Sequence, residues 1–214
     1  MALDSLKATG HAQLPVDFSR TKIKDAYPGS RVPLFVPKAA GELTVQELSW
    51  GFLPQFASGK LVFNTRIETA LVAAQTQRGM WAHAIVHGRC LVPVRCFYEY
   101  NTQAAKHARA SQQARREADE LILQRPAPAS PKRRPPSPQV KFELPGFSVF
   151  LLACVTDGEH FSVVTTAPNQ DMSPIHNRMP LVLGPGESGL WLGPQFDTLI
   201  DRSQIRLSAT PEDA

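Results

Sequence analysis

Cysteine is scarce in this sequence, and its spacing forms no motif. The 214-residue chain has three cysteines, Cys90, Cys96 and Cys154. An odd number without any Cys-x-x-Cys spacing argues against a disulfide framework and against a zinc site built on thiolates. We therefore expect reduced thiols in a cytoplasmic protein.

Long apolar runs are missing as well. No stretch reaches the roughly 18 apolar residues that a transmembrane helix needs, and the first twenty residues hold no continuous apolar segment of the secretory type. A composition with 43% hydrophobic and 20% charged residues is typical of a globular protein. These features predict a cytoplasmic monomer with no membrane partner.

Basic residues are concentrated in one segment. The net charge is +4, but residues 101–141 hold nine Lys/Arg and three acids, which leaves −2 for the rest of the chain. Six prolines within 126–138 exclude regular secondary structure there. We interpret 101–141 as a basic, Pro-rich insertion within a single domain of residues 1–214. It is either a solvated loop or an arm that touches nucleic acid, and both interpretations stay open.

Local patterns predict more strands than helices. Helical stretches are expected at 69–87 and 103–123 and just after Leu183, whereas the tail from about Gln195 has no clear pattern. Runs rich in β-branched and aromatic residues predict strands at 31–37, 61–69, 89–100, 147–156 and 160–167, the last two joined at Asp157-Gly158. The expected fold class is α+β, mainly an antiparallel sheet with peripheral helices.

Two expected strands carry polar residues with a period of two. In the first, Asn64, Arg66 and Glu68 lie on one face. In the second, Glu99 shares a face with Phe97 and Leu91, opposite the two neighbouring tyrosines. That is an unusual place for a carboxylate, because an unpaired buried charge is costly.

A polar loop lies between two apolar runs within residues 162–183. It contains His176, which can change protonation near neutral pH. It also contains Arg178, whose planar fork of donors suits a phosphate or a carboxylate. The two prolines at 174 and 180 favour a defined loop geometry. The alternative, a hairpin loop whose His and Arg simply face water, stays open.

Metal and thiol chemistry have little support. His83 and His87 are four residues apart on an expected helix, but Ala84, Ile85 and Val86 between them supply no glutamate of an H-E-x-x-H site. No cysteine sits in a recognisable nucleophile context. The sequence therefore predicts no metal and no cofactor.

Four short motifs occur in order along the chain, and together they resemble one family. They are WGFLP (50–54), FNTRIET (63–69), RCLVPVRCFYEY (89–100) and SPIHNRMPLVL (173–183). Their residues, order and spacing resemble those of the SOS response-associated peptidase (SRAP) family. The resemblance implies a barrel-type sheet that binds single-stranded DNA at abasic sites. In that family a cysteine exposed by removal of the initiator Met closes a thiazolidine with the abasic aldehyde, forming a DNA–protein crosslink.

The resemblance also implies roles for single residues. Asn64 resembles the asparagine that orients the reacting sugar and the N-terminus. Glu99 resembles the acid beside the terminal amine, and His176 the histidine that moves protons at the sugar. Condensation of an aldehyde with an amine needs such a proton shuttle, and two groups of different pKa can provide it.

Other matching positions concern DNA contacts. Arg66 and Arg178 resemble arginines that hold backbone phosphates, which position the strand without reading sequence. Trp50 and Pro54 resemble the apolar wall near the displaced base. For Glu68 we favour a simpler interpretation, in which it pairs with a neighbouring arginine.

The chain departs from the family at its start. It begins Met1-Ala2-Leu3-Asp4, where the family has Met-Cys-Gly-Arg, so the thiol nucleophile and one arginine are absent. Cys96 cannot replace that thiol, because a thiazolidine needs the amine and the thiol on the same terminal residue. Crosslinking by this chain would then be lost or impaired.

Three interpretations of this start remain. The true start lies upstream, or the chain binds DNA without crosslinking, or the Ala2 amine forms an imine and promotes β-elimination. Whether the chain is an enzyme, with lyase or autopeptidase activity, therefore stays open. The alternative from another class is a non-catalytic module for single-stranded nucleic acid, whose affinity comes from residues 101–141.

Overall fold

The structure is a computed structural model that describes residues 25–38, 42–54, 59–103, 110–111, 113–114 and 139–212. A large sheet has the strand order β10-β7-β4-β1-β2-β8-β3, with β9 paired to β8. Its strands are β1 (Arg31–Pro37), β2 (Leu43–Trp50), β3 (Asn64–Arg66), β4 (Arg89–Val94), β7 (Phe150–Thr156), β8 (His160–Thr166), β9 (Met179–Pro180) and β10 (Val182–Leu183).

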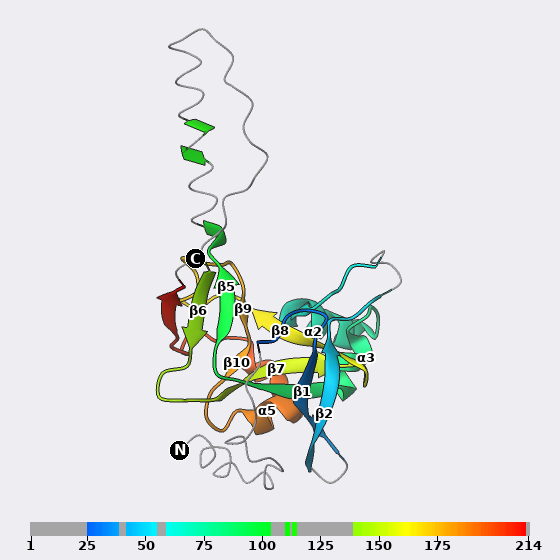
Figure 1. Ribbon diagram of the computed structural model, residues 1–214. Coiled ribbons are helices and arrows are strands. Elements are labelled where there is room, and N and C mark those ends of the chain that lie inside the picture. Colours follow the sequence, from blue (N-terminus) through cyan, green and yellow to red (C-terminus); the bar gives the residue numbers. More distant parts are fainter. Residues whose placement is uncertain are drawn as a thin grey trace.

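A smaller sheet and short helices complete the described part. The small sheet has the order β11-β6-β5, and in Figure 1 β5 and β6 stand on the left while two helices, α2 and α3, lie on the right. Its strands are β5 (Phe97–Tyr100), β6 (Gln139–Glu143) and β11 (Ser208–Pro211), and the helices are α2 (Ile67–Thr76), α3 (Ala82–His87), α5 (Ser188–Leu192) and the 3₁₀ helix η4 (Phe196–Leu199).

The pairings are mostly antiparallel, which confirms the predicted α+β class with a mainly antiparallel sheet. Parallel pairs occur only where β8 meets β2 and β3, within the described strands. Strand β7 pairs with β4 on one side, and it also pairs with β8.

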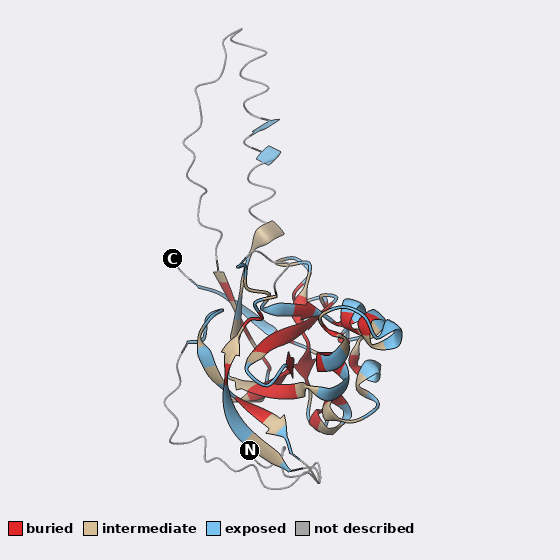
Figure 2. Cartoon of the chain, turned by 90° about the vertical axis from the view of Figure 1, so that its right-hand side faces the viewer, coloured by how far each residue is buried: buried red, intermediate tan, exposed pale blue. Residues whose placement is uncertain are grey.

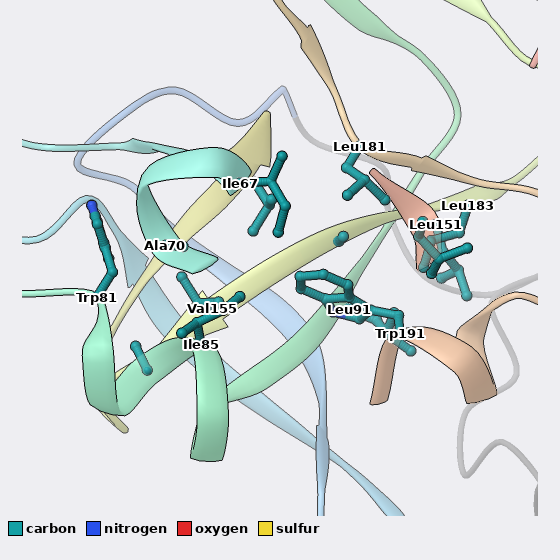
Figure 3. Packing of buried hydrophobic residues seen from close by; sticks show 14 of the residues in the cluster. Ile67, Ala70, Trp81, Ile85, Leu91, Leu151, Val155, Leu181, Leu183 and Trp191 are labelled. Atoms are coloured by element: carbon teal, nitrogen blue, oxygen red, sulfur yellow. The ribbon is translucent and has the colours of Figure 1, made fainter. Parts of the chain in front are cut away.

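Strand β7 lies at the centre of the core. All seven of its residues are buried, because successive side chains point to opposite faces and both faces are covered. Leu151 and Val155 pack with residues of α2, α3 and α5, such as Ile67 and Trp191, in one apolar cluster (Figure 3). Leu152 faces a second cluster that includes Phe142 of the small sheet. Figure 2 shows buried segments at the centre and exposed surfaces on the helices and the outer strands.

The predicted strand at 61–69 is wrong beyond Arg66. A helix begins at Ile67, and its buried residues Ile67, Ala70 and Ala73 recur every three residues. This helical spacing and the alanine-rich sequence outweigh the short alternation that suggested a strand. Glu68 therefore lies in the first turn of α2 and not on a strand face.

Two long predicted elements are each divided. The helix predicted at 69–87 stops at Gln77, which has a left-handed φ of 54° and serves as the C-cap of α2. The strand predicted at 89–100 bends at Arg95 and continues as β5 in the other sheet. Leu91 and Glu99 thus belong to different sheets, and their predicted common face is wrong.

Several other expectations can be compared directly. The hairpin of β7 and β8 around Asp157-Gly158 is confirmed. Strand β6 begins at Gln139, inside the predicted insertion, and pairs with β5 at Tyr100. Residues 110, 111, 113 and 114 are helical, whereas the rest of 104–138 lies outside the described residues. The patternless tail contributes η4 and β11.

The three cysteines are free thiols. Cys90 and Cys154 are direct partners across β4 and β7, and both are fully buried. Burial raises the pKa of both thiols, so neither provides a thiolate at neutral pH. In the part of the chain that the structure describes, no helix is long and apolar enough to cross a membrane.

Candidate functional site

Glu99 and His176 meet at the junction of the two sheets. Glu99 lies on β5, where its side chain and that of Phe97 are half-buried while Tyr98 and Tyr100 on the other face are exposed. Glu99 Oε2 lies 3.9 Å from His176 Nδ1. That distance is within ion-pair range but too long for a hydrogen bond. Neither group is therefore fully occupied by the other, and both can exchange a proton with a third group.

The backbone of the loop holds the His176 ring. Nδ1 lies 3.0 Å from the Arg178 carbonyl oxygen and 3.3 Å from the Arg178 amide nitrogen. On the shorter contact we assign the proton to Nδ1, which donates to the carbonyl. Nε2 is then the unprotonated nitrogen of the neutral ring, and it can accept a proton from a substrate.

Local hydrogen bonds build the loop that carries His176. The buried Asn169 accepts hydrogen bonds from the amides of Asp171 and Met172 through its Oδ1, which starts a turn. The Met172 carbonyl then accepts the amide of His176 at 2.9 Å. Just beyond β5, Thr102 Oγ1 donates to the Ile175 carbonyl at 3.3 Å. The loop is thus fixed to the strand that carries Glu99.

The surroundings of Glu99 favour its neutral form. Burial raises the pKa of the Glu99 carboxyl, and the nearby His176 partly lowers it again. A carboxyl with a raised pKa beside a histidine is a common arrangement for acid–base chemistry.

Arg178 makes a salt bridge with Glu68. Its Nη1 and Nη2 donate to the two carboxylate oxygens at 2.9 and 2.8 Å. Nη2 also donates to the Thr165 carbonyl of β8 at 2.7 Å. The bond from Arg178 is the main cause of a lowered pKa of Glu68. The expectation that Glu68 pairs with a neighbouring arginine is confirmed, and Arg178 is therefore not free as the structure stands.

Asn64 and Arg66 lie on the neighbouring strand. Both side chains are exposed on β3, and Thr65 between them is buried and donates to Ser162 Oγ at 2.8 Å. Arg66 is the partner of Thr165 in the parallel pairing of β3 with β8. Thr165 is therefore paired with Arg66 of β3 and accepts a hydrogen bond from Arg178, so both predicted phosphate contacts lie next to the same residue of β8.

Trp50 has a defined place at the end of β2. Its indole is stacked on Phe161 at 6.0 Å between ring centroids, meets Phe63 edge to face, and donates through Nε1 to the Phe63 carbonyl. Pro54 is half-buried after the exposed Leu53. The predicted role of Trp50 and Pro54 as a wall beside a displaced base stays a prediction.

Two further expectations concern a nucleophile and a metal. Ala2, the expected amine, lies outside the described residues. His83 and His87 contact each other on α3, with ring centroids 4.9 Å apart. No group of three or more His, Cys, Asp or Glu capable of holding a metal occurs among residues that the structure describes.

Arg89 has a structural role that the motif alone did not reveal. Its guanidinium donates to carbonyls at the end of α3, including Ile85, and at the end of α5, including Trp191. It also lies over the ring of Phe196, 4.2 Å from the centroid. Carbonyls in the last turn of a helix lack intrahelical partners, so Arg89 caps two helices at once. Its distance along the chain from α5 hid this role from sequence reasoning.

One family model matches almost the whole chain. The family model described as SOS response associated peptidase (SRAP) matches residues 7–213. A curated relative, the abasic site processing protein YoaM of Bacillus subtilis (strain 168), is 26% identical over 153 residues, covering 70% of this chain and 56% of YoaM. This chain thus matches little more than half the length of that relative.

Solved structures share the fold. A crystal structure from Bordetella bronchiseptica has a TM-score of 0.64 at 16% identity, covering 99% of this chain and 96% of its own. Another from Bacteroides thetaiotaomicron has a TM-score of 0.58 at 17% identity, covering 99% and 89%. A phage-related protein from Bordetella bronchiseptica has a TM-score of 0.58 at 18% identity, covering 92% and 87%. With a family model that matches almost the whole chain, this protein belongs to the SOS response-associated peptidase family.

Proposed function

We propose that this protein acts in DNA damage processing by binding single-stranded DNA at abasic sites. The observation that carries the proposal is the Glu99–His176 pair, whose side chains approach to 3.9 Å from two separate elements. Arg66 and Arg178 both lie next to Thr165, and Arg178 belongs to the loop that carries His176. The similarity to YoaM, an abasic site processing protein, supports abasic sites as the target.

The pair can serve an aldehyde and an amine. As the amine nitrogen attacks the aldehyde carbon, a base takes a proton from the nitrogen and the carbonyl oxygen takes one from an acid or from water, which gives a carbinolamine. An acid then protonates the hydroxyl, which leaves as water, and the protonated imine that remains loses its proton to a base or is reduced by borohydride. Nε2 of His176 suits the base, and the Glu99 carboxyl, whose pKa burial raises, suits the acid.

The amine decides how far the reaction proceeds. An amine without a thiol on the same residue can form an imine from which β-elimination can follow, whereas a thiazolidine needs both groups on one residue. We therefore propose imine and lyase chemistry as one outcome at this site, with the stable crosslink of the family as the other.

The test is to mix the full chain with a single-stranded oligonucleotide that carries one abasic site. Borohydride should trap a covalent adduct detectable by mass spectrometry. An oligonucleotide with a tetrahydrofuran analogue, which lacks the aldehyde, should bind without forming an adduct. Binding without any adduct would favour the non-catalytic module, and equal affinity for duplex and single strands would overturn the proposal.

The proposal also covers the closure of the large sheet and the oligomeric state. We propose that the large sheet closes as a barrel, which is supported by the pairing of β7 with both β4 and β8. We also propose a cytoplasmic monomer, in keeping with three free thiols. Light scattering of the purified chain tests the oligomeric state.

A further inference from the structure

We propose that the Glu68 carboxylate occupies, in the absence of DNA, the position of a backbone phosphate at Arg178, and that the phosphate displaces it. This inference rests on the proposed DNA binding and adds a specificity-determining residue to it. Glu68 would thereby exclude weakly binding anions from the Arg178 guanidinium, and only a ligand with more negative charge would displace it.

The geometry of the pair is that of anion recognition. Two parallel hydrogen bonds of 2.9 and 2.8 Å join the arginine fork to the two oxygens of Glu68. A phosphate presents two oxygens to such a fork in the same way. The carboxylate therefore marks where a phosphate would sit.

The two partners differ in how firmly they are held. The Arg178 side chain is 18% exposed and the Glu68 side chain 49%. Arg178 also donates to the carbonyl of Thr165, a buried residue of β8. When the pair opens, Glu68 can turn into solvent while Arg178 keeps its bond to the strand.

Arg178 is also incompletely satisfied by Glu68. Its Nε is buried and has no hydrogen-bond partner among the described residues. A buried donor without an acceptor is costly, and a salt bridge that served only to fix the fold would be expected to satisfy it. A ligand with more acceptor oxygens than a carboxylate can improve on Glu68.

The surroundings favour a second anion. Arg178 and, more weakly, Arg66 both lower the pKa of Glu68. Arg66 is exposed at the N-cap of the ten-residue α2, makes no side-chain cap bond there, and leaves Glu68 in the first turn. The start of a helix favours negative charge. A phosphate that replaces Glu68 would therefore lie in the positive potential of Arg178, Arg66 and the start of α2.

The alternative is that the Glu68–Arg178 salt bridge only stabilises the packing of α2 against the loop before β9. The two explanations involve the same contacts but predict different effects of removing Glu68. In the alternative, loss of Glu68 would loosen Arg178 and weaken DNA binding or leave it unchanged. In the displacement mechanism, loss of Glu68 frees Arg178 and strengthens binding.

The experiment measures the affinity of a fluorescent single-stranded oligonucleotide with one tetrahydrofuran site over a range of salt concentrations. Wild type is compared with Glu68→Gln and with Glu47→Gln, which removes the same charge from an exposed ion pair on β2. We expect Glu68→Gln to bind roughly three- to tenfold more tightly than Glu47→Gln, with a similar salt slope, because the phosphate contacts Arg178 in both bound proteins. In Arg178→Gln the further change Glu68→Gln should bring no such gain.

Each outcome decides something. Equal or weaker binding by Glu68→Gln relative to Glu47→Gln overturns the displacement mechanism, even if wild type binds DNA as proposed. If neither wild type nor any variant binds, the proposed function fails and this inference with it. Should Glu68→Gln fold poorly, Glu68→Asp, with its shorter reach to Arg178, must show a gain of the same sign.

Discussion

Glu99 and Glu68 are two carboxylates with opposite environments. Glu99 is half-buried beside a titratable histidine at 3.9 Å, and burial raises its pKa. Glu68 accepts two hydrogen bonds from a permanently charged arginine, and that arginine lowers its pKa. The surroundings of Glu99 thus favour proton exchange, whereas those of Glu68 keep it ionised.

The difference shows what the partner contributes. A histidine beyond hydrogen-bond distance leaves burial as the main influence on the pKa of Glu99, whereas an arginine that donates two hydrogen bonds holds the Glu68 carboxylate ionised. The two pairs share one loop, because His176 and Arg178 are two residues apart. This loop therefore presents a proton-exchange function and an anion-binding function side by side.

The largest expected effect follows from removing the proton-exchanging carboxyl. Glu99→Gln keeps the shape but cannot exchange a proton, so trapped adduct should form about 100- to 10,000-fold more slowly. DNA affinity should stay close to that of wild type. Single-turnover trapping at saturating protein measures the rate. Glu143→Gln, which removes an exposed carboxylate paired with Lys141, should leave the rate unchanged.

The next largest effect concerns the Arg178–Glu68 salt bridge and the stability of the fold. Arg178→Ala removes the bonds to Glu68 and to the Thr165 carbonyl, and we expect it to lower the free energy of unfolding by about 1–3 kcal/mol. Urea denaturation followed by tryptophan fluorescence measures this. Arg31→Ala, which removes an exposed ion pair with Glu47, should cost less than about 1 kcal/mol. Equal losses in the two variants would mean that Arg178 is no better anchored than a surface arginine.

Acid should weaken the fold through Glu68. Since its folded pKa lies below the usual value of 4.5, its stabilising contribution is present above that value and is lost as pH falls through the folded pKa. Glu68→Gln should therefore lose less stability than wild type between neutral pH and the acid range. Melting temperatures measured from pH 7 down to pH 3 test this, and parallel curves for the two proteins would contradict it.

Glu99 should show the smallest effect and the opposite sign. Its folded pKa is raised, so its favourable contribution is present below the unfolded value and is lost as pH rises through the folded one. Relative to wild type, Glu99→Gln should thus gain stability on going from pH 4 to pH 7. The same melting series decides it, because a gain that is larger at pH 4 would reverse the assignment.

Sequence reasoning worked best where a pattern was long and local. The apolar runs that became β7 and β8, and the turn at Asp157-Gly158 between them, were predicted with their type and order. It failed at Ile67, where a three-residue strand gives way to a helix, because alternation over so few residues cannot be told from the start of a helical repeat. The prediction of one strand over 89–100 failed at Arg95, because a bend between two sheets does not change the periodicity of the sequence.

For the candidate site, motifs identified residues but not contacts. Glu99 and His176 were both singled out, and their approach across 77 positions of sequence became visible only in the structure. Arg178 was predicted to contact a phosphate, and only the structure shows that Glu68 occupies its fork. Arg89 was part of a motif, and although the α3 carbonyls that it binds are only three and four positions away, its capping of α5 depends on residues about a hundred positions away.

By itself, the sequence determined the family, the mainly antiparallel α+β class and the set of reactive side chains. These follow from local periodicity and from residue types at short spacing. The tertiary structure alone decided which carboxylate meets the imidazole and which meets the guanidinium. Both choices depend on how β5, α2 and the loop before β9 pack around β8, and packing between distant segments sets the burial and the charges that fix each pKa.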